Sequence, residues 1–539
     1  MLKNNLYSRE AAVTEETFEQ NVNKLRSVLE VAPTLVVDVE TNGLDSFGTN
    51  QICGIGLGEP TLGGLTQYYP FRHHEGNNLP YDNLEKLIST LNELVQTYIG
   101  YNLKFDLHFL EKEGLSVLDK KLIDVIVMVR LVEHSDTKEL GLSATGKRNY
   151  GQEAIQYDDD TKKVLKANKG WFRDFSKAPA DILGDYCQED VILTTRIYND
   201  YLKKIQESQQ VSIFDMECEL TKVLYAMERR GISVDKQYAL DVEKLITSRL
   251  LEVENEILGI SNRKRWNYDI PMSSKKHEED EFNISSPKQI GDVFNSMGIE
   301  SPVKTSKGQD SWNEAALINI NHRMAGLIRQ YRTLEKLKST YILPYTEIDT
   351  MHTSFCNWGT ATGRLSSREP NLQNIPRNHF KLIEKPLTED DKLDIKGKIS
   401  AMVAQKGITI DNELSDDVLS TWSFIGDESY DASDKDQIAI RRLFIPRPNY
   451  SLVGFDYSQM EVRVFMSYFR NPEIDAILNK EDVDFHSEAA KLAFKIDEDH
   501  DRFKEYRQYA KAITFGTIYG IGNKKLAQQL NTTPQEAGK

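Results

Sequence analysis

The pattern of apolar and polar positions changes several times along this chain, and each change predicts a different element. Residues 34–37 and 452–455 are short apolar runs that predict buried strands, and each run leads into acidic residues. A helical pattern begins at Val211 and ends at Gly231, before an extended stretch. Residues 237–260 repeat apolar residues at helical spacing, so we expect a long amphipathic helix there.

Length and composition limit the kind of protein. A chain of 539 residues is too long for one hydrophobic core, and we expect three or four domains. No apolar run approaches the roughly 20 residues of a membrane helix, and the N-terminus lacks the apolar segment of a signal peptide. The four cysteines lack metal-site spacing, which predicts free thiols in a reducing compartment. We therefore expect a cytoplasmic protein with no membrane partner.

The charge is unevenly distributed along the chain. A net charge of −16 taken alone argues against a nucleic-acid partner. Residues 411–436, however, contain nine acidic residues and one lysine, whereas residues 323–338 carry a single glutamate and a group of cations. We therefore expect a concentrated basic surface formed by Arg323, Arg329, Arg332, Lys336 and Lys338.

The first candidate carboxylates follow the apolar run at 34–37. The alternation of a strand places Asp38 and Glu40 on one face, where like charges repel unless a cation lies between them. Oxygen ligands suit Mg²⁺ or Mn²⁺, but a solvated strand end explains this pair equally well. Asp106 lies where a helix is predicted to start, and Tyr186 and Asp190 are spaced to share one helix face.

A second group of candidates lies near the C-terminal end of the sequence. Asp456 ends the apolar run at 452–455, and a buried carboxylate there needs either a salt-bridge partner or a metal ion. Downstream, Arg507, Lys511, Phe515 and Tyr519 recur every four residues and so share one helix face. Cations at that pitch suit a triphosphate, and aromatic rings suit a base.

These stretches resemble known motifs. FDYSQMEVR (455–463) and the RxxxKxxxFGxxYG pattern at 507–520 resemble motifs A and B of the family A DNA polymerases. The order and spacing of Asp38, Glu40, Asp106, Tyr186 and Asp190 resemble the three motifs of the DnaQ-like 3′-5′ exonucleases. The resemblance implies an α/β ribonuclease H-like exonuclease domain followed by an α+β right-hand polymerase domain with thumb, partial palm and partial fingers.

The resemblance also implies roles for the exonuclease residues. The four carboxylates would hold two divalent ions, Mg²⁺ with Mn²⁺ as an alternative, and Tyr186 would orient the attacking water. The presence of all five residues argues against an inactive proofreading fold.

For the polymerase site, the resemblance implies that Asp456 binds both catalytic Mg²⁺ ions and that Lys511 protonates the departing pyrophosphate. Glu461 would occupy the space next to the sugar 2′ position and so exclude ribonucleotides, which carry a hydroxyl there. The implied nucleotide-binding residues are Tyr457, Gln459, Glu461, His486, Arg507, Lys511, Phe515 and Tyr519.

Residues 360–377 (TATGRLSSREPNLQNIPR) are rich in hydroxyl, amide, glycine and proline residues and predict an ordered loop. They resemble the family motif TGRLSSxxPNLQNIP, which implies contact with primer-template DNA near the active site. The implied DNA-binding residues are Thr362, Arg364, Asn371, Gln373 and Asn374.

The predicted division is an exonuclease domain at 1–205 and a polymerase domain at 206–539. Within the latter we expect a thumb at about 237–345, a palm at about 206–236 and 346–478, and the start of the fingers at about 479–539. The acidic insert at about 379–436 departs from the family pattern. An accessory subdomain and a partly ordered loop are equally open for it.

Motif C, a His-Asp hairpin that supplies a second metal-binding aspartate in the family, is not found after Tyr519. Three hypotheses therefore stay open. The chain is the N-terminal portion of a replicative polymerase that needs a second polypeptide to complete palm and fingers, a stand-alone exonuclease with a vestigial polymerase region, or a nonenzymatic DNA-binding replisome component. We favour the first, with primer-template DNA and deoxynucleoside triphosphates as partners and a bacteriophage origin in a bacterial cytoplasm.

Overall fold

The computed structural model describes residues 11–61, 64–133, 137–267, 269, 278–376, 379–381, 392–393, 395–397, 399, 415, 426–427, 437–468, 484–530 and 533–538. The chain divides into two compact units, unit 1 (1–232 and 350–374) and unit 2 (233–349 and 375–539). Unit 1 thus contains the predicted exonuclease domain together with two segments of the predicted polymerase domain. Most of the predicted insert at 379–436, and Arg377, lie outside the described residues.

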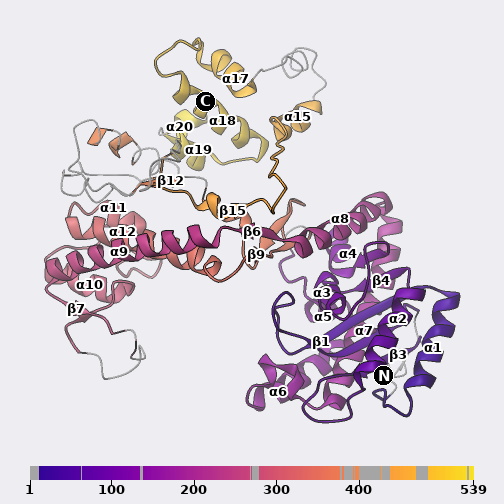
Figure 1. The fold of residues 1–539 in the computed structure, drawn as a ribbon. Coiled ribbons are helices and arrows are strands. Elements are labelled where there is room, and N and C mark those ends of the chain that lie inside the picture. The colour runs from indigo at the N-terminus through magenta and orange to yellow at the C-terminus, as the bar shows by residue number, and fades with distance from the viewer. Residues whose placement is uncertain are drawn as a thin grey trace. The chain divides into compact units, whose positions relative to one another are not determined.

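A mixed sheet forms the centre of unit 1 (Figure 1). Five of the described strands lie in the order β3-β2-β1-β4-β5. Strand β1 is parallel to β4 and antiparallel to β2, and β5 is parallel to β4. The strands are β1 (Thr34–Thr41), β2 (Ile52–Gly58), β3 (Thr66–Pro70), β4 (Thr97–Gly100) and β5 (Lys121–Asp124). The strand predicted at 34–37 is therefore confirmed, and it extends through the two acidic residues.

Helices cover both faces of this sheet, as the alternation along β1 requires. Leu35 and Val37 belong to the core cluster that includes residues of α1 and α2. Val36 belongs to the cluster that includes residues of α4 and α7. This α/β/α layering confirms the predicted class of the first domain. The helices are α1 (Phe18–Val31), α2 (Tyr81–Leu94), α3 (Lys104–Lys112), α4 (Val125–Val132), α5 (Leu142–Tyr150), α6 (Gln156–Ala167) and α7 (Ala180–Glu207), with 3₁₀ turns at Gln152–Ile155, Trp171–Arg173 and Phe175–Lys177.

Helix α8 (Val211–Arg230) ends at Gly231, as predicted, and β6 (Ile232–Val234) follows. Gly231 has φ 61°, a conformation that glycine adopts without strain. A Cβ there would also lie 2.8 Å from the Met351 carbonyl oxygen, so a side chain has no room. The second segment of unit 1 contains β9 (Thr350–Met351), β10 (Ser354–Cys356), β11 (Ser366–Arg368) and a 3₁₀ turn at Leu372–Asn374.

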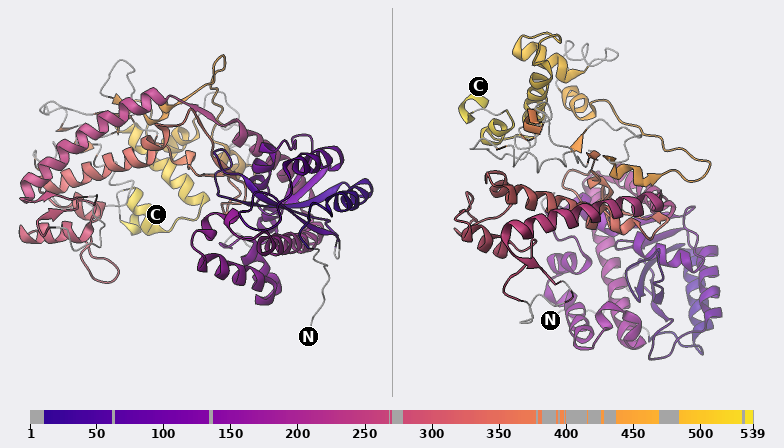
Figure 2. Two further views of the ribbon diagram at one scale, coloured as in Figure 1. Left: turned by 60° about the horizontal axis from the view of Figure 1, so that its bottom comes forward. Right: turned by 60° about the vertical axis from the view of Figure 1, so that its left-hand side comes forward.

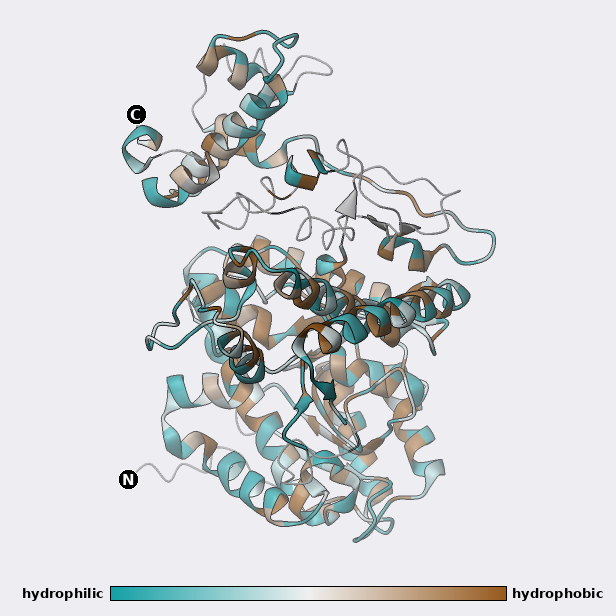
Figure 3. Ribbon diagram, turned by 90° about the vertical axis from the view of Figure 1, so that its left-hand side faces the viewer, coloured by the Kyte–Doolittle hydropathy of each residue, from teal (hydrophilic) through white to brown (hydrophobic). Residues whose placement is uncertain are grey.

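Long helices dominate the first part of unit 2 (Figure 2). Helix α9 (Lys236–Ser261) confirms the helix predicted at 237–260, and its buried residues include Ala239, Val242 and Ile246 at helical spacing. Hydrophobic and hydrophilic residues alternate along the helical ribbons in Figure 3. The other elements of this part are β7 (Lys264–Arg265), β8 (Glu281–Phe282), α10 (Pro287–Ser296), α11 (Glu314–Ile318), α12 (Arg323–Lys336), a π-helix at Leu337–Ile342 and a 3₁₀ turn at Leu343–Tyr345.

The prediction of a concentrated basic surface on α12 and the following π-helix is wrong for most of its cations, because they are buried or paired. Arg329 is buried and pairs with Glu314 at 2.9 Å. Arg323 pairs with Glu256, Lys338 pairs with Glu243 at 2.9 Å, and the Arg332 guanidinium donates to the Trp312 carbonyl oxygen at 2.7 Å. The count of cations in the sequence did not include their partners, which are distant in the chain. Of the five cations, only Lys336 is exposed, whereas Arg323, Arg332 and Lys338 are half-buried.

A group of helices forms the last part of unit 2. Helix α18 (Phe503–Ile518) packs against α17 (Phe485–Phe494) and α19 (Asn523–Gln529). The helix predicted from residues that recur every four positions at 507–519 is therefore confirmed, and Tyr519 is its C-cap. The remaining elements are β12 (His379–Lys381), β13 (Gly426–Asp427), β14 (Gln437–Ile438), a 3₁₀ turn at Ile440–Leu443, β15 (Phe444–Ile445), α15 (Met460–Ser467) and α20 (Pro534–Ala537).

The buried strand predicted at 452–455 is wrong. Residues 451–457 have no regular secondary structure, and the Phe455 side chain is 93% exposed. An apolar run becomes a buried strand only when neighbouring strands pair with it, and none of the described strands pairs with these residues.

Two expectations about the chain as a whole can also be compared with the structure. Among the described residues, no helix is long and apolar enough to cross a membrane. The four cysteines are free, as predicted, and the structure shows that all four are buried.

Candidate functional site

Strand β1 directs two carboxylates toward helix α7. Asp38 and Glu40 follow the period of Val36, whose side chain packs in the cluster that contains α7 residues. The carboxylate oxygens of both residues and the Cys187 sulfur on α7 all lie within 4.8 Å of one another. Glu40 is 4% exposed, whereas Asp38 keeps partial access to solvent.

Two further carboxylates come from helices. The Val39 N–H donates to Asp106 Oδ1 at 3.1 Å and so fixes the carboxylate of α3 beside β1. The Tyr157 hydroxyl of α6 donates to Asp190 Oδ1 at 2.5 Å and so fixes the carboxylate of α7. Both aspartates are buried. The structure therefore brings all four sequence-predicted carboxylates into one cluster, which we call the β1 acidic cluster (Asp38, Glu40, Asp106 and Asp190).

The electrostatics of the β1 acidic cluster show how closely its members interact. Burial raises the pKa of Asp38 to about 6. The pKa of Glu40 is raised well above its usual value by burial and then by the charges of Asp38, Asp190 and Asp106. Burial, followed by the charge of Asp38, also raises the pKa values of Asp106 and Asp190.

The β1 acidic cluster fits divalent cations. In the part of the chain that the structure describes, no lysine or arginine forms an ion pair with any of its four carboxylates, although buried carboxylates are normally paired or coordinate metals. Oxygen ligands of this number suit Mg²⁺ or Mn²⁺, so all four residues could hold such ions.

The predicted tyrosine lies beside the cluster but binds a different partner. The Tyr186 hydroxyl donates to Asp158 Oδ1 of α6 at 3.2 Å. Asp158 also accepts from the Ser143 hydroxyl at 2.7 Å and pairs with Lys162 at 2.7 Å. Burial of the Tyr186 hydroxyl, followed by the charges of Asp190 and Glu40, raises the pKa of Tyr186. The hydroxyl therefore stays protonated and can donate a hydrogen bond.

Sequence reasoning missed Tyr157, Asp158 and Cys187 as parts of this site. Tyr157 and Asp158 lie on α6, and the only local signal is the run of three aspartates at 158–160. Cys187 immediately follows Tyr186, but nothing in the sequence says that it faces Asp38.

The segment at 350–374 presents the predicted DNA-binding side chains to solvent. Thr362, Arg364, Asn371, Gln373 and Asn374 are all exposed. The loop is nevertheless ordered by its own polar groups. Gln373 Nε2 donates to the Leu365 carbonyl oxygen at 2.9 Å, and the Gln373 N–H donates to Asn371 Oδ1 at 3.1 Å.

In unit 2, Asp484 connects two of the predicted nucleotide-binding residues. Its carboxylate accepts from Arg507 Nε at 2.6 Å and from Gln459 Nε2 at 3.2 Å. Gln459 in turn accepts from the Phe485 N–H at 3.0 Å, which fixes the start of α17. Sequence reasoning missed Asp484, whose local signal is only its place as the N-cap of α17.

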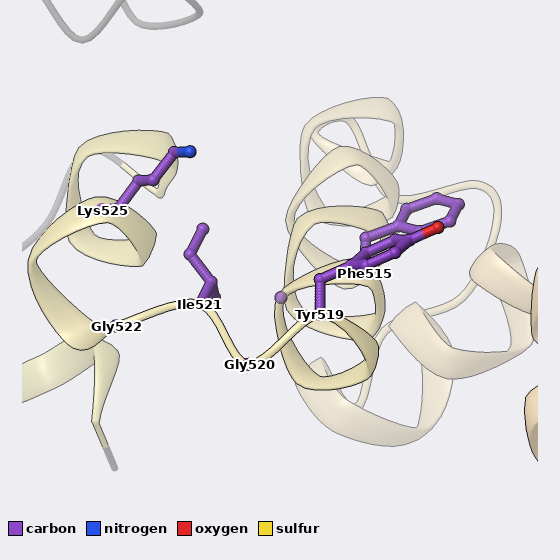
Figure 4. Close-up of a pocket in the computed structure, with 7 residues that line it drawn as sticks. Phe515, Tyr519, Gly520, Ile521, Gly522 and Lys525 are labelled. Atoms are coloured by element: carbon purple, nitrogen blue, oxygen red, sulfur yellow. The ribbon is translucent and has the colours of Figure 1, made fainter. Parts of the chain in front are cut away.

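The aromatic end of α18 lies next to α17. The ring of His486 is 5.5 Å from that of Phe515, and Phe515 stacks on Tyr519 at 6.4 Å. Burial lowers the pKa of His486. The charge of Asp484 opposes this shift, and the charges of Lys511 and Arg507 add to it. Figure 4 shows the two stacked rings on one side of Gly520, with Ile521 and Lys525 on the other side, and these residues line a pocket.

The remaining predicted polymerase residues lie on the segment before α15 and in its first turn. Asp456 and Tyr457 are exposed on the irregular segment 451–457, and Glu461 lies in the first turn of α15. No hydrogen bond or ion pair among the described residues joins Asp456 to Arg507 or Lys511.

Comparisons with known proteins match the two parts of the chain to two families. The family model described as DNA polymerase family A matches residues 267–539, and the model described as 3′-5′ exonuclease matches residues 12–206. The chain is 25% identical over 538 residues to DNA polymerase I of Borreliella burgdorferi, covering 97% of this chain and 48% of that protein. It is 31% identical over 346 residues to DNA polymerase I of Helicobacter pylori strain J99, covering 63% of this chain and 30% of that protein.

The fold is also similar to a solved structure. The POL domain of Pol1 from M. smegmatis, in complex with DNA primer-template and dNTP, superposes with a TM-score of 0.57 and 19% identity. The match covers 98% of this chain and 74% of that one. The chain spans about half or less of the length of the curated relatives quoted above.

Proposed function

The chain belongs to DNA polymerase family A, with a 3′-5′ exonuclease domain at residues 12–206, and from this premise we propose that it removes nucleotides from DNA 3′ ends and binds deoxynucleoside triphosphates for DNA synthesis. The observation that carries the proposal is the β1 acidic cluster. Three buried carboxylates and the half-buried Asp38, with no ion pair to a lysine or arginine among the described residues, are costly unless they bind cations. We propose the division at residues 1–205 and 206–539 as the functional one.

In the exonuclease site, Asp38, Glu40, Asp106 and Asp190 would hold two Mg²⁺ ions, or Mn²⁺ in their place. Such ions lower the pKa of an attacking water and stabilise the leaving 3′ oxygen. The Val39 N–H and the Tyr157 hydroxyl keep Asp106 and Asp190 in place. We propose that Tyr186, held by Asp158, orients the water.

In the polymerase region, we propose that Arg507, Lys511 and His486 bind the triphosphate, with Lys511 as the proton donor to the leaving pyrophosphate. Phe515 and Tyr519 would pack against the sugar and the base. Tyr457, Gln459 and Glu461 complete the proposed nucleotide site, and Asp456 is its proposed metal ligand. The support is the position of Arg507, His486 and Phe515 around the junction of α17 and α18.

The proposed DNA partner is a primer-template, with Thr362, Arg364, Asn371, Gln373 and Asn374 as its contacts. The exposure of all five side chains supports this proposal. The second polypeptide, the bacteriophage origin and the cytoplasmic location stay predictions that no observation here tests.

The test is a primer-template labelled at the primer 5′ end, incubated with the purified chain, Mg²⁺ and all four deoxynucleotides, beside an Asp38→Ala control. We expect shortening of the primer by the wild-type chain and none by the variant. An unchanged primer in both reactions would contradict the exonuclease proposal. Extension of the primer would contradict the expectation that a second polypeptide must supply motif C.

A further inference from the structure

We propose that Cys187 is a thiolate ligand of the β1 acidic cluster, which gives the cluster a binding site for soft divalent cations such as Zn²⁺ and Cd²⁺. The inference rests on the proposed exonuclease site and adds a ligand to it. Its basis is a group of three possible ligand atoms. One carboxylate oxygen each from Asp38 and Glu40 and the sulfur of Cys187 all lie within 4.8 Å of one another.

The geometry suits a small cation. The Cys187 thiol donates a hydrogen bond to Asp38 Oδ2 at 3.2 Å, and a bound cation would take the place of this proton between the two atoms. Bond lengths of ~2.3 Å to sulfur and ~2.1 Å to oxygen place two ligands of a tetrahedral Zn²⁺ roughly 3.6 Å apart. The Asp38–Cys187 spacing is therefore near that of two ligands on one ion. The Glu40 oxygen lies within 4.8 Å of both atoms, so a shift of at most about 1 Å would bring it to the same ion.

A second observation points to a ligand independently of the cysteine. Glu40 is 4% exposed, and its carboxylate accepts no hydrogen bond from any residue that the structure describes. A largely buried carboxylate with no hydrogen-bond donor among the described residues is stabilised by a bound cation. Because its oxygen lies in the same group as Asp38 and Cys187, the ion that satisfies Glu40 also lies within reach of the sulfur.

The packing around Cys187 holds the sulfur in this position. A Cβ at Gly56 of β2 would lie 2.6 Å from Cys187 Sγ, so the glycine leaves the space that the sulfur occupies. On binding a cation, the Cys187 S–H bond breaks, its proton leaves to water, and the sulfur forms the bond to the ion. Thiolate ligands select Zn²⁺ and its softer relatives, whereas carboxylates alone favour Mg²⁺ and Mn²⁺.

The experiment titrates the metal-free chain with Cd²⁺ and follows the ultraviolet absorption of thiolate-to-cadmium charge transfer. We expect one equivalent of Cd²⁺ to produce the band in the wild-type chain and in Cys53→Ala. Cys53 is the matched control because it is a buried, free thiol in the same unit, outside the ligand group. Cys187→Ala and Cys187→Ser should both lose the band, and circular dichroism verifies that they fold.

A band that persists in both Cys187 variants, or that is absent from the wild-type chain, would overturn the inference. Mg²⁺-dependent shortening of DNA by the wild-type chain is measured in parallel. If shortening fails while the cadmium band is present, the proposed function is wrong and the thiolate site stands. If shortening is present without the band, only the thiolate ligand is wrong.

Discussion

At the scale of single residues, the Asp38 carboxylate couples the stability of unit 1 to pH and to divalent cations. Its pKa is raised from the ordinary value of about 3.9 to about 6 by burial. The folded state therefore binds this proton more tightly than the unfolded state does. The stabilisation is fully present below about pH 4 and is lost as the pH rises through about 6.

We expect the melting temperature of the metal-free chain to fall between pH 4 and pH 7 relative to that of Asp38→Asn, which cannot ionise there. Addition of Mg²⁺ should raise the wild-type melting temperature more at pH 7.5 than at pH 5, because the ion binds the ionised carboxylates. Asp119→Asn, an exposed site in the same unit, is the control. Parallel pH profiles for the wild type and Asp38→Asn would show that burial of Asp38 does not matter.

A second residue-scale prediction concerns the two tyrosines beside the cluster. Tyr157→Phe removes the hydrogen bond to Asp190, and Tyr186→Phe removes the one to Asp158. Loss of a group that orients a metal ligand typically costs 10- to 100-fold, so we expect Tyr157→Phe to slow single-turnover DNA shortening by about tenfold or more. Tyr150→Phe serves as the control, because it removes a tyrosine hydrogen bond to Asp200, which is not a member of the β1 acidic cluster.

The outcome separates two assignments. If Tyr186→Phe alone slows the reaction, the role belongs to the tyrosine predicted from the motif. If Tyr157→Phe slows it as well, α6 is part of the active site.

At the scale of elements, a buried ion cluster joins α3 to α8 and β10. The Glu228 carboxylate accepts from Lys104 Nζ at 2.6 Å, from His108 Nε2 at 2.7 Å and from the Phe355 N–H at 2.6 Å. Lys104 also donates to the Phe355 carbonyl oxygen. Because Asp106 lies between Lys104 and His108, the cluster fixes the helix that carries a predicted metal ligand.

We expect Glu228→Ala to lower the free energy of unfolding of unit 1 by about 3–5 kcal/mol, because it leaves the buried Lys104 without its anionic partner. Urea denaturation followed by circular dichroism measures the loss. Glu219→Ala on the same helix is the control, since Glu219 is 68% exposed and its pair with Lys222 should contribute about 0–1 kcal/mol. Equal effects of the two substitutions would contradict the assignment of a structural role to the buried cluster.

At the scale of the whole molecule, the two proposed sites are built from different compact units. The β1 acidic cluster belongs to unit 1, and the residues around α17 and α18 belong to unit 2. Each site draws its described contacts from its own unit. The two activities should therefore respond to substitutions independently.

We expect Asp38→Ala to abolish DNA shortening and to leave deoxynucleotide binding unchanged. Lys511→Ala should weaken triphosphate binding by about tenfold or more, since a hydrogen bond to a charged group contributes about 1.5–3 kcal/mol, and should leave shortening unchanged. Fluorescence titration with a labelled deoxynucleotide and the labelled-primer assay measure the two properties. Loss of both activities in either variant would contradict the independence of the sites.

Several features follow from the sequence because they depend on residues close together in the chain. Strand alternation in β1 places Asp38 and Glu40 on one face of the strand. A spacing of four residues places Arg507, Lys511 and Phe515 on one face of helix α18. The helix end at Gly231 follows from that one residue and its neighbours. These periodicities depend only on residues that are close together in the chain. The packing of distant elements therefore does not change them, and the structure confirms them.

Other features required the tertiary structure because their partners are far apart in the sequence. Tyr157 reaches Asp190, Cys187 faces Asp38, and Asp484 holds Arg507 through folding of separate elements. The run at 452–455 is apolar enough for a strand, but the described chain provides no partner strand, so it is exposed instead. The sequence by itself determined which side chains each element presents. The packing of distant elements decided which of them meet, because burial and ion pairing depend on neighbours that no local pattern encodes.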